Sequence, residues 1–274
     1  MSNLPPNSFP LSVFNVTLGA LIYLRFIIFL NASTASSAVL FLIGSISNLS
    51  DIDFADIGIA GAVGTITGTR LGDGGGNSGI TFDAPKTVYN VGNNSNWSSN
   101  VWATTPTGTP DLNNFPLIQD TVKFDNTSTS VIMQSYNIGS IDLSTRASPF
   151  TIYMNNALQI FGNVTLNSTT TLSPTYTITF YGRNNQKFTS NGCIITNSNN
   201  AIPFIINKYN SSFILGDALT ILGSPTAALL SLVQGTLDLN GYTLTTTGFD
   251  SSAQIPNLPL TNNVARNRSM IVNG

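Results

Sequence analysis

The sequence predicts an all-β protein, and three observations support that prediction. The chain of 274 residues has no Glu and only 4 Lys, although exposed helices normally draw on both residue types. Asn, Thr and Ser together account for 96 residues, and these types favour turns or strands. Short runs in which apolar and polar residues alternate recur along the chain, and this period of two is typical of β-strands.

The first segment, residues 1–31, is strongly apolar. Its residues 11–30 are long enough to cross a membrane, but Arg25 lies inside the run and no basic residue precedes it. A signal peptide normally begins with basic residues, and a charge within a membrane span is costly. Two interpretations therefore stay open: an anchor or export signal, or a strand or helix that packs on a neighbouring chain.

Residues 32–126 are predicted to form a smaller β element. Apolar residues alternate with Asp or small residues between Ile52 and Ile59, which indicates strands. The segment Gly72–Gly79 is predicted to be a loop, because consecutive glycines do not hold a strand. Further short strands around an aromatic core that contains both tryptophans are expected at 88–91, 101–103 and 121–124.

Residues 127–253 carry a degenerate repeat in which short apolar runs are separated by Asn, Gly, Ser or Thr. This pattern is typical of a β-solenoid of the parallel β-helix kind, in which coils of roughly 20–25 residues stack on one another. Stacked like charges repel, which agrees with the absence of any charge in residues 147–182. The rival fold is a β-sandwich, which has a similar spacing of strands and turns. Residues 254–274 are predicted to be a tail or the start of another element.

The composition excludes several kinds of function. Without His, neither a Ser-His-Asp nor a Cys-His arrangement is available for catalysis. The single Cys193 cannot form an internal disulfide or replace His in a zinc site. A net charge of −2 provides no basic surface for nucleic acid. We therefore expect a protein with no catalytic residues, no metal and no cofactor.

Several segments of the chain resemble known proteins. The segments that resemble a block found in virion structural proteins of uncultured marine phages are ISNLSDIDFADI, GTRLGDGGGNSGITFDAPKTVYN, NWSSNVWA and NFPLIQDTVKFDN. Those that resemble the β-solenoid repeats of phage fibre or appendage proteins are FTSNGCIITN, ILGDALTILG and GTLDLNGYTLTTTGFDSS. The resemblance covers roughly residues 40–253. It implies an elongated, trimeric, particle-associated protein whose partners are other virion proteins.

Three aromatic residues are the candidate contact with carbohydrate. Trp97, Trp102 and Tyr89 lie close together in the sequence, and flat aromatic faces stack on sugar rings. Packing in the core is the alternative for such large side chains.

Two groups of residues are candidates for binding an ion. The loop Gly72–Gly79 with Asp73 is either a tight turn or an ion site, but Ile80 follows the last glycine where a P-loop needs Lys and Ser or Thr. The carboxylates of Asp51, Asp53 and Asp56 either bind a hard cation or form the solvated face of an edge strand.

Paired carboxylates are the candidates for glycan hydrolysis. Asp120 with Asp125, or Asp217 with Asp238, are possible acid and base pairs of a glycan-cleaving tailspike. The alternative for Asp217 is that its side chain binds the backbone of a turn. Cys193 lies in an apolar strand and is interpreted as a buried small hydrophobe.

These observations favour one function and leave two alternatives. The main hypothesis is a non-enzymatic structural protein of a phage particle, a fibre or appendage shaft that contacts a host-surface glycan. The alternatives are a secreted or surface-anchored bacterial β-solenoid adhesin, and a glycan-cleaving tailspike.

Overall fold

The computed structural model describes residues 38–42, 49–61, 65–92, 95–124, 128–133, 137–174, 176–197, 204–223, 229–251 and 268–272. Within these ranges the one helical element is the 3-10 turn η1 (Leu112–Asn114), and every other regular element is a strand. The prediction of an all-β chain is therefore confirmed. The apolar segment 1–31 lies outside the described residues.

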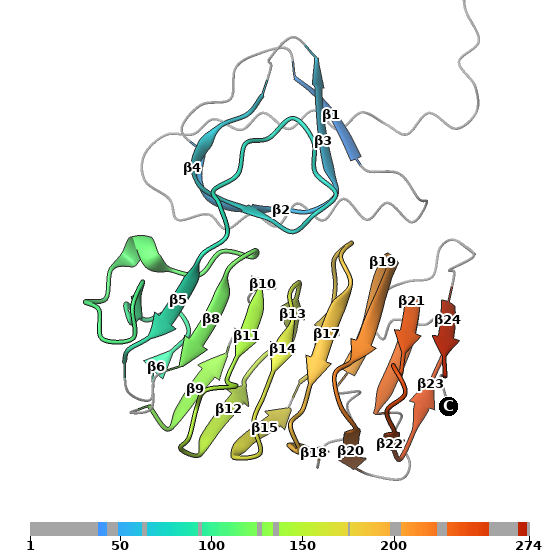
Figure 1. The fold of residues 1–274 in the computed structure, drawn as a ribbon. Coiled ribbons are helices and arrows are strands. Elements are labelled where there is room, and N and C mark those ends of the chain that lie inside the picture. Colours follow the sequence, from blue (N-terminus) through green and yellow to red (C-terminus); the bar gives the residue numbers. More distant parts are fainter. Residues whose placement is uncertain are drawn as a thin grey trace, which may run out of the picture.

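Four strands form a small unit that precedes the larger body of the molecule (Figure 1). In this unit β1 (Ala38–Leu42) pairs in parallel with β3 (Ile57–Gly61), and β2 (Leu49–Phe54) pairs in parallel with β4 (Gly68–Asp73). Asp51 and Arg70 occupy corresponding places in β2 and β4, both have φ of 57°, and their side chains form an ion pair. The ion pair thus joins the same bend of two successive passes of the chain.

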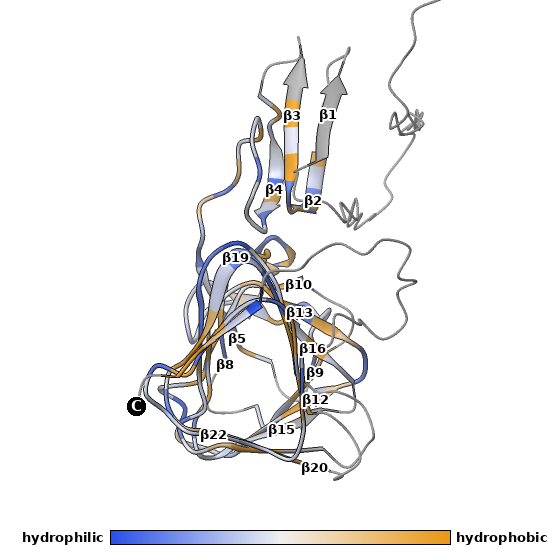
Figure 2. Ribbon diagram, turned by 90° about the vertical axis from the view of Figure 1, so that its right-hand side faces the viewer, coloured by the Kyte–Doolittle hydropathy of each residue, from blue (hydrophilic) through white to orange (hydrophobic). Residues whose placement is uncertain are grey.

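The larger body consists of three columns of strands, in which successive passes of the chain lie side by side (Figures 1 and 2). The first column contains β5 (Thr87–Asn90), β8 (Thr121–Phe124), β11 (Ser140–Asp142), β14 (Val164–Thr165), β17 (Gln186–Thr189), the second halves of β19 (Phe204–Leu215) and β21 (Leu230–Asp238), and β24 (Arg268–Ile271). The second contains β6 (Ser95–Asn96), β9 (Ser130–Met133), β12 (Phe150–Met154) and β15 (Thr170–Pro174), followed in a separate sheet by β18 (Ile194–Asn197), β20 (Leu219–Gly223) and β22 (Leu244–Thr246). The third contains β10 (Asn137–Ile138), β13 (Leu158–Ile160), β16 (Ile178–Phe180), the first halves of β19 and β21, and β23 (Phe249–Asp250).

The sheets are curled and mixed. Among the described strands all pairs are parallel, except that β5 pairs antiparallel with β7 (Trp102–Ala103). Each of β19 and β21 runs through two columns, and β19 changes its register to β21 between Ile206 and Ser212. This irregularity bends the strand so that one sheet of 13 strands joins the first and third columns.

The core lies inside the three columns. Strands such as β9, β12 and β13 alternate between buried and less buried residues, which is the period of two that the sequence shows. One continuous cluster of buried apolar side chains runs through the columns. At its centre Phe180 packs on Phe204 and Phe213, with ring centroids 5.3 and 4.6 Å apart. Burial of these apolar side chains is the main favourable contribution to folding.

Asparagine side chains connect successive passes at the corner between the first and second columns. Asn167 donates through Nδ2 to the carbonyl of Leu143 at 3.2 Å. Asn240 does the same to the carbonyl of Leu215 at 3.1 Å. Asn191 donates to the carbonyl of the preceding pass as well, and it has a positive φ of 48°, which Asn tolerates better than most residues. These bonds satisfy carbonyls that the turn leaves without a strand partner.

The structure places two segment limits differently from the sequence-based prediction. The parallel columns begin at β5, well before residue 127, because β5 already pairs in register with β8. Within residues 254–274, which were predicted to be a tail or the start of an element belonging to a partner or a longer chain, Arg268–Ile271 forms strand β24 beside β21 of this chain. Such pairing joins residues far apart in the chain, so local periodicity does not reveal it.

Candidate functional site

The two tryptophans lie inside the protein. Trp97 and Trp102 are 0% and 1% exposed, and their ring centroids are 4.7 Å apart in an edge-to-face arrangement. The indole N–H of Trp102 donates to the carbonyl of Trp97 at 3.0 Å. Tyr89 is half-buried on β5. Because neither indole face is open, Trp97 and Trp102 do not form the carbohydrate platform suggested by the sequence, and packing is the role that the geometry supports.

The tryptophans close one end of the core. Phe124 of β8 lies 6.2 Å from the ring of Trp102, and Phe115, which follows η1, lies 6.4 Å from it. The antiparallel strand β7 covers the outer edge of β5 at the same end of the columns. At this end of the columns, β7 therefore pairs with the backbone edge of β5, and the aromatic side chains cover the apolar core.

The three candidate aspartates of the small unit are separated by their partners. Asp51 pairs with Arg70, and Asp56 pairs with Arg183 of the larger body. Asp53 accepts a hydrogen bond of 3.4 Å from Asn137 Nδ2. Within the described part of the chain, no three His, Cys, Asp or Glu side chains gather in a way that could hold a metal ion. The arrangement joins the small unit to the larger body.

The glycine-rich loop is a turn held by its own side chains. Asp73 Oδ1 accepts hydrogen bonds from the backbone N–H of Gly75 at 2.8 Å and from Asn77 Nδ2 at 2.6 Å. Asn77 Oδ1 in turn accepts from the N–H of Ile57 at 2.9 Å. Gly76 has φ of +74°, which the turn requires and which glycine adopts without strain. Of the two interpretations of Gly72–Gly79, this geometry supports the tight turn, although the predicted loop begins two residues too early because Gly72 and Asp73 still belong to β4.

Asp120 is a buried carboxylate that organises the backbone. Its Oδ1 accepts from the N–H of Lys86 and its Oδ2 from the N–H of Leu117, each at 2.9 Å. The ammonium group of Lys86 lies 3.0 Å from Oδ2. The suggested partner Asp125 lies outside the described residues. Asp120 thus ties the turn before β8 to the strand β5 beside it, and the described geometry provides it with no second carboxylate.

Asp217 also binds a turn. It accepts from the backbone N–H of Ser190 at 2.7 Å, from the Ser190 hydroxyl at 3.1 Å and from the N–H of Asn191. Asp238 accepts from the N–H of Asn240, only two residues further along the chain, at 2.8 Å. In the register of β19 and β21, Asp238 stands beside Ile214 and not beside Asp217. These two aspartates therefore occupy different positions of successive passes, and the turn-binding alternative for Asp217 is the one that the geometry supports.

We expect Asp217→Asn to lower the free energy of unfolding by about 1–2 kcal/mol, since an amide cannot accept through both of its terminal atoms. Urea denaturation measures this change. Asp238→Asn is the matched control, because Asp238 has a single bond to its own turn, and we expect it to cost under about 0.5 kcal/mol. Equal stability of Asp217→Asn and the unmodified protein would contradict a structural role for Asp217.

Two buried polar side chains have shifted pKa values, and the sequence analysis identified only one of them as buried. Cys193 is 3% exposed, its thiol lies 3.1 Å from the carbonyl of Thr170, and burial raises the pKa of the thiol. Lys208 is 0% exposed, and burial lowers the pKa of its ammonium group to about 7. Its Nζ donates to the carbonyl of Tyr181 at 2.8 Å. The interpretation of Cys193 as a buried hydrophobe agrees with its position, whereas Lys208 looks like a surface residue in the sequence.

An ion pair lies on the outer face of the first column. Lys123 Nζ and Asp142 Oδ2 are 2.9 Å apart on the adjacent strands β8 and β11. The hydrogen bond to Asp142 raises the pKa of Lys123. Burial alone raises the pKa of Asp142, but the bonds from Ser144 and Lys123 outweigh burial, so that this pKa is lowered. Both groups are partly exposed, and the pair joins neighbouring strands without forming a reactive centre.

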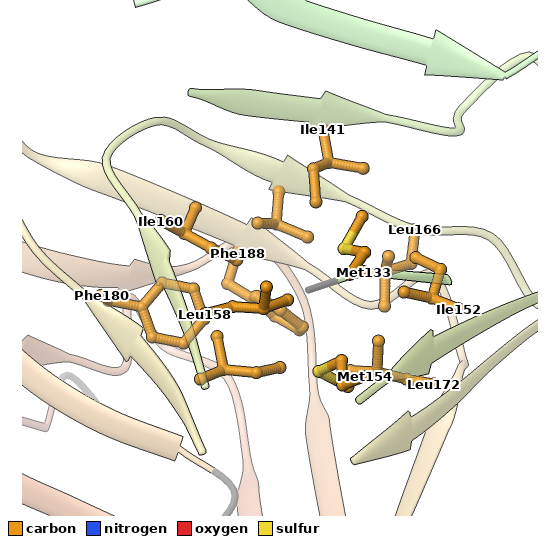
Figure 3. Close-up of a pocket in the computed structure, with 12 residues that line it drawn as sticks. Met133, Ile141, Ile152, Met154, Leu158, Ile160, Leu166, Leu172, Phe180 and Phe188 are labelled. Carbon is orange, nitrogen blue, oxygen red and sulfur yellow. The ribbon is translucent and has the colours of Figure 1, made fainter. Parts of the chain in front are cut away.

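The core contains a small apolar cavity of about 20 Å³ (Figure 3). Its walls are apolar side chains, among them Met133, Met154 and Phe180, and they present no polar surface to the cavity. A space of this size and lining is a packing gap, because a bound water needs polar partners.

We compared the chain with known protein families, curated proteins and solved structures. No family model, no curated protein and no solved structure matches the chain. Among the residues that the structure describes, no helix is both long and apolar enough to span a membrane.

Proposed function

We propose that this chain is a non-enzymatic structural protein of a phage particle, and that its parallel columns form a β-solenoid. The observation that carries the proposal is the pairing of each pass of the chain with the next in a parallel register. In the first column, Val122 stands beside Ile141, Ile141 beside Val164, and Val164 beside Phe188. Each partner lies about one predicted coil further along the sequence, where coils of roughly 20–25 residues are expected.

Parallel pairing favours the solenoid over the rival β-sandwich. Sandwich domains are built from antiparallel sheets with Greek-key connections. Here β5 with β7 is the single antiparallel pair among the described strands. In addition, the side chains at the corners bind the backbone of the adjacent pass, as Asn167 and Asn240 do. Such bonds hold stacked coils together but have no counterpart in the packing of two sheets face to face.

The use of polar residues supports a scaffold role. Asp120 and Asp217 direct their carboxylates to backbone N–H groups, and the candidate aromatic residues Trp97 and Trp102 close the core. The assignment to a phage particle depends on the resemblance of residues 40–253 to virion proteins. The trimeric state that the resemblance implies is not part of the proposal.

Immunogold electron microscopy tests the assignment to a particle. An antibody raised against the whole chain should label the surface of particles that package this gene, and mass spectrometry of those particles should detect the chain. Label on the surface of bacterial cells and none on particles would overturn the proposal in favour of the adhesin. The neighbouring genes discriminate the same two functions, since capsid, portal or terminase genes accompany a virion protein and secretion genes accompany an adhesin.

A further inference from the structure

The small unit of β1–β4 is joined to the larger body by a short crossing of the chain. Phe82 still packs on Phe54 of the small unit, with ring centroids 6.1 Å apart. The N–H of Lys86 already donates to Asp120 of the larger body at 2.9 Å. Residues 83–85 therefore form the crossing.

Side chains of the larger body fix the small unit beside this crossing. Gln119 Nε2 donates to the carbonyl of Asp83 at 3.1 Å, and its Oε1 accepts from the N–H of Asp73 at 2.9 Å. Ile118 packs in the same place, because a Cβ on Gly72 would lie 3.0 Å from its Cγ2 atom. We call this side the pivot, since covalent, polar and apolar contacts all meet there.

A second attachment lies further along the larger body, over which the small unit stands where β10 and β19 are labelled (Figure 2). The guanidinium group of Arg183 pairs there with Asp56 of the small unit, and we call this ion pair the latch. Arg183 precedes β17, which is three strands from β8 in the first column, so strand spacing places it about 14 Å from the pivot. Between the two attachments, Asn137 Nδ2 makes a long hydrogen bond of 3.4 Å to Asp53.

The irregular part of β19 holds the turn that carries Arg183. Lys208 Nζ donates to the carbonyl of Tyr181 at 2.8 Å, and Ser211 Oγ donates to the next carbonyl along the chain at 3.2 Å. The guanidinium carbon of Arg183 lies 4.3 Å from the ring centroid of Tyr209, which is a cation–π contact. These residues of β19 lie where its register to β21 changes. The irregularity therefore positions Arg183 as well as bending the sheet.

The glycine-rich loop gives Arg183 a place against the small unit. Gly76 has a positive φ of 74°, and a Cβ at this position would lie 2.7 Å from Arg183 Cδ. The arginine side chain thus lies directly against the backbone of the loop. A larger residue at Gly76 would displace it from Asp56.

The two attachments differ in their sensitivity to salt. The side chains of Arg183 and Asp56 are 27% and 49% exposed, and ion pairs at exposed positions are weak and screened by ions. Ile118 at the pivot is 1% exposed, and salt does not screen the burial of an apolar side chain. High ionic strength is therefore expected to weaken the latch and to leave the pivot intact.

We propose that the small unit is a hinged arm, which turns about the pivot and is held against the larger body by the ion pair of Arg183 and Asp56. The structure shows the closed form, and rising ionic strength populates an open form. Polar contacts between parts of one chain commonly permit such relative motion. The inference is independent of the proposed function, because it depends only on contacts within this chain.

Energy transfer between two dyes tests the proposal on the full chain. Thr67→Cys and Asn184→Cys provide exposed attachment points in the small unit and beside the latch. Cys193 is 3% exposed, and a buried thiol does not react readily with a dye. We expect the transfer efficiency to fall reversibly as NaCl is raised from about 0.05 M to about 1 M, since the screening length falls about fourfold or more.

Variants of the latch identify the contact that holds the arm. Arg183→Gln removes an exposed ion pair and a cation–π contact, and we expect it to raise the equilibrium constant for opening about tenfold. Asp56→Asn should also favour opening, and the two changes together should add less than their sum, because each breaks the same pair. Arg183→Lys keeps the charge and should keep the response to salt. Lys187→Gln is the matched control, since it removes an exposed cation of β17 that follows the latch by four residues.

The outcomes separate a hinged arm from a fixed one. Transfer that falls with salt in the unmodified protein, and that is already low at low salt in Arg183→Gln but not in Lys187→Gln, would support the proposal. Circular dichroism must show the variants folded, which we expect because both members of the latch are partly exposed. Transfer that is independent of salt, equal effects of Arg183→Gln and Lys187→Gln, or fully additive effects of Arg183→Gln and Asp56→Asn would overturn it.

Discussion

Replacing Lys208 by Met is expected to raise the free energy of unfolding at pH 7 by about 2 kcal/mol. Lys208 is fully buried, and burial lowers its pKa to about 7 from the ordinary 10.5. By linkage, this shift costs the folded state about 4 kcal/mol at neutral pH relative to a side chain that never ionises. Methionine is similar in length, and its apolar side chain avoids this cost. The substitution also removes the hydrogen bond from Nζ to the carbonyl of Tyr181, and this loss reduces the stabilisation by about 1–3 kcal/mol.

The pH dependence separates this electrostatic effect from simple repacking. Between pH 7 and 10.5 the unfolded chain keeps the proton on Lys208 while the folded chain releases it. The free energy of unfolding of the unmodified protein therefore rises with pH in this window, and below pH 7 the full cost remains. We expect the advantage of Lys208→Met to shrink by about 1.6 kcal/mol between pH 7 and 8.5.

Urea denaturation of both proteins at these two pH values is the measurement. The range stops at pH 8.5 because the raised pKa of Cys193 works in the opposite direction: above pH 9 its thiol ionises more readily in the unfolded chain. Lys187→Met, at an exposed position of β17, is the control and should change the stability by less than about 0.5 kcal/mol. A constant difference between Lys208→Met and the unmodified protein at both pH values would disprove the lowered pKa as its cause.

Local alternation was sufficient to predict much of the core. Leu158 and Ile160 of β13, and Phe180 of β16, are at the alternating positions of the sequence, and all three are buried. The alternation fails where two apolar residues are adjacent. Ile194 is apolar but 56% exposed, because Cys193 and Ile195 on either side of it face inward. A shift by one residue reverses every side chain of a strand, and the sequence alone does not fix that choice.

Contacts between distant residues determine the features that the sequence did not reveal. Lys208 lies in the irregular part of β19, where the register to β21 shifts, and this shift brings a residue of a polar run into the interior. Asp120 finds its partner Lys86 through the pairing of β5 with β8, 34 residues away. The burial of Trp102 depends on the pairing of its own strand, β7, with β5 and on Phe115, and both contacts form only in the folded chain. Residue type and local pattern contain no information on these pairings.

Gly139→Ala is expected to lower the free energy of unfolding by about 3 kcal/mol or more. Gly139 lies at the corner between β10 (Asn137–Ile138) and β11 (Ser140–Asp142), where the chain runs directly against the turn of the preceding pass. A Cβ atom there would be 2.1 Å from the carbonyl oxygen of Asp120 and 2.8 Å from that of Ile118. Both obstacles are backbone atoms, so no side-chain rotation can relieve the overlap and the two passes have to separate.

The equivalent corner of the next pass, at Gly162, also has no room for a Cβ atom. The effect of Gly139→Ala is therefore expected to spread to the packing between passes. Gly162 donates to the carbonyl of Gly139 at 3.1 Å, and a Cβ on Gly162 would lie 2.5 Å from the backbone nitrogen of Ser140. Separation at Gly139 would therefore also break the bond of 2.8 Å between the N–H of Ser140 and the carbonyl of Asp120. The pass that contains Gly139 would then lose contacts with the passes on both of its sides, through Asp120 on one side and Gly162 on the other.

Chemical denaturation and the yield of soluble protein measure this loss. Gly192→Asn is the matched control, because nothing lies within 4 Å of a Cβ at that position, and Asn tolerates its positive φ of 81°. We expect the control to stay within about 1 kcal/mol of the unmodified protein. If Gly139→Ala were equally stable, the passes at this corner would have to be further apart than the structure places them. A selective loss of stability at Gly139 is the result that the close approach of neighbouring passes at this corner requires.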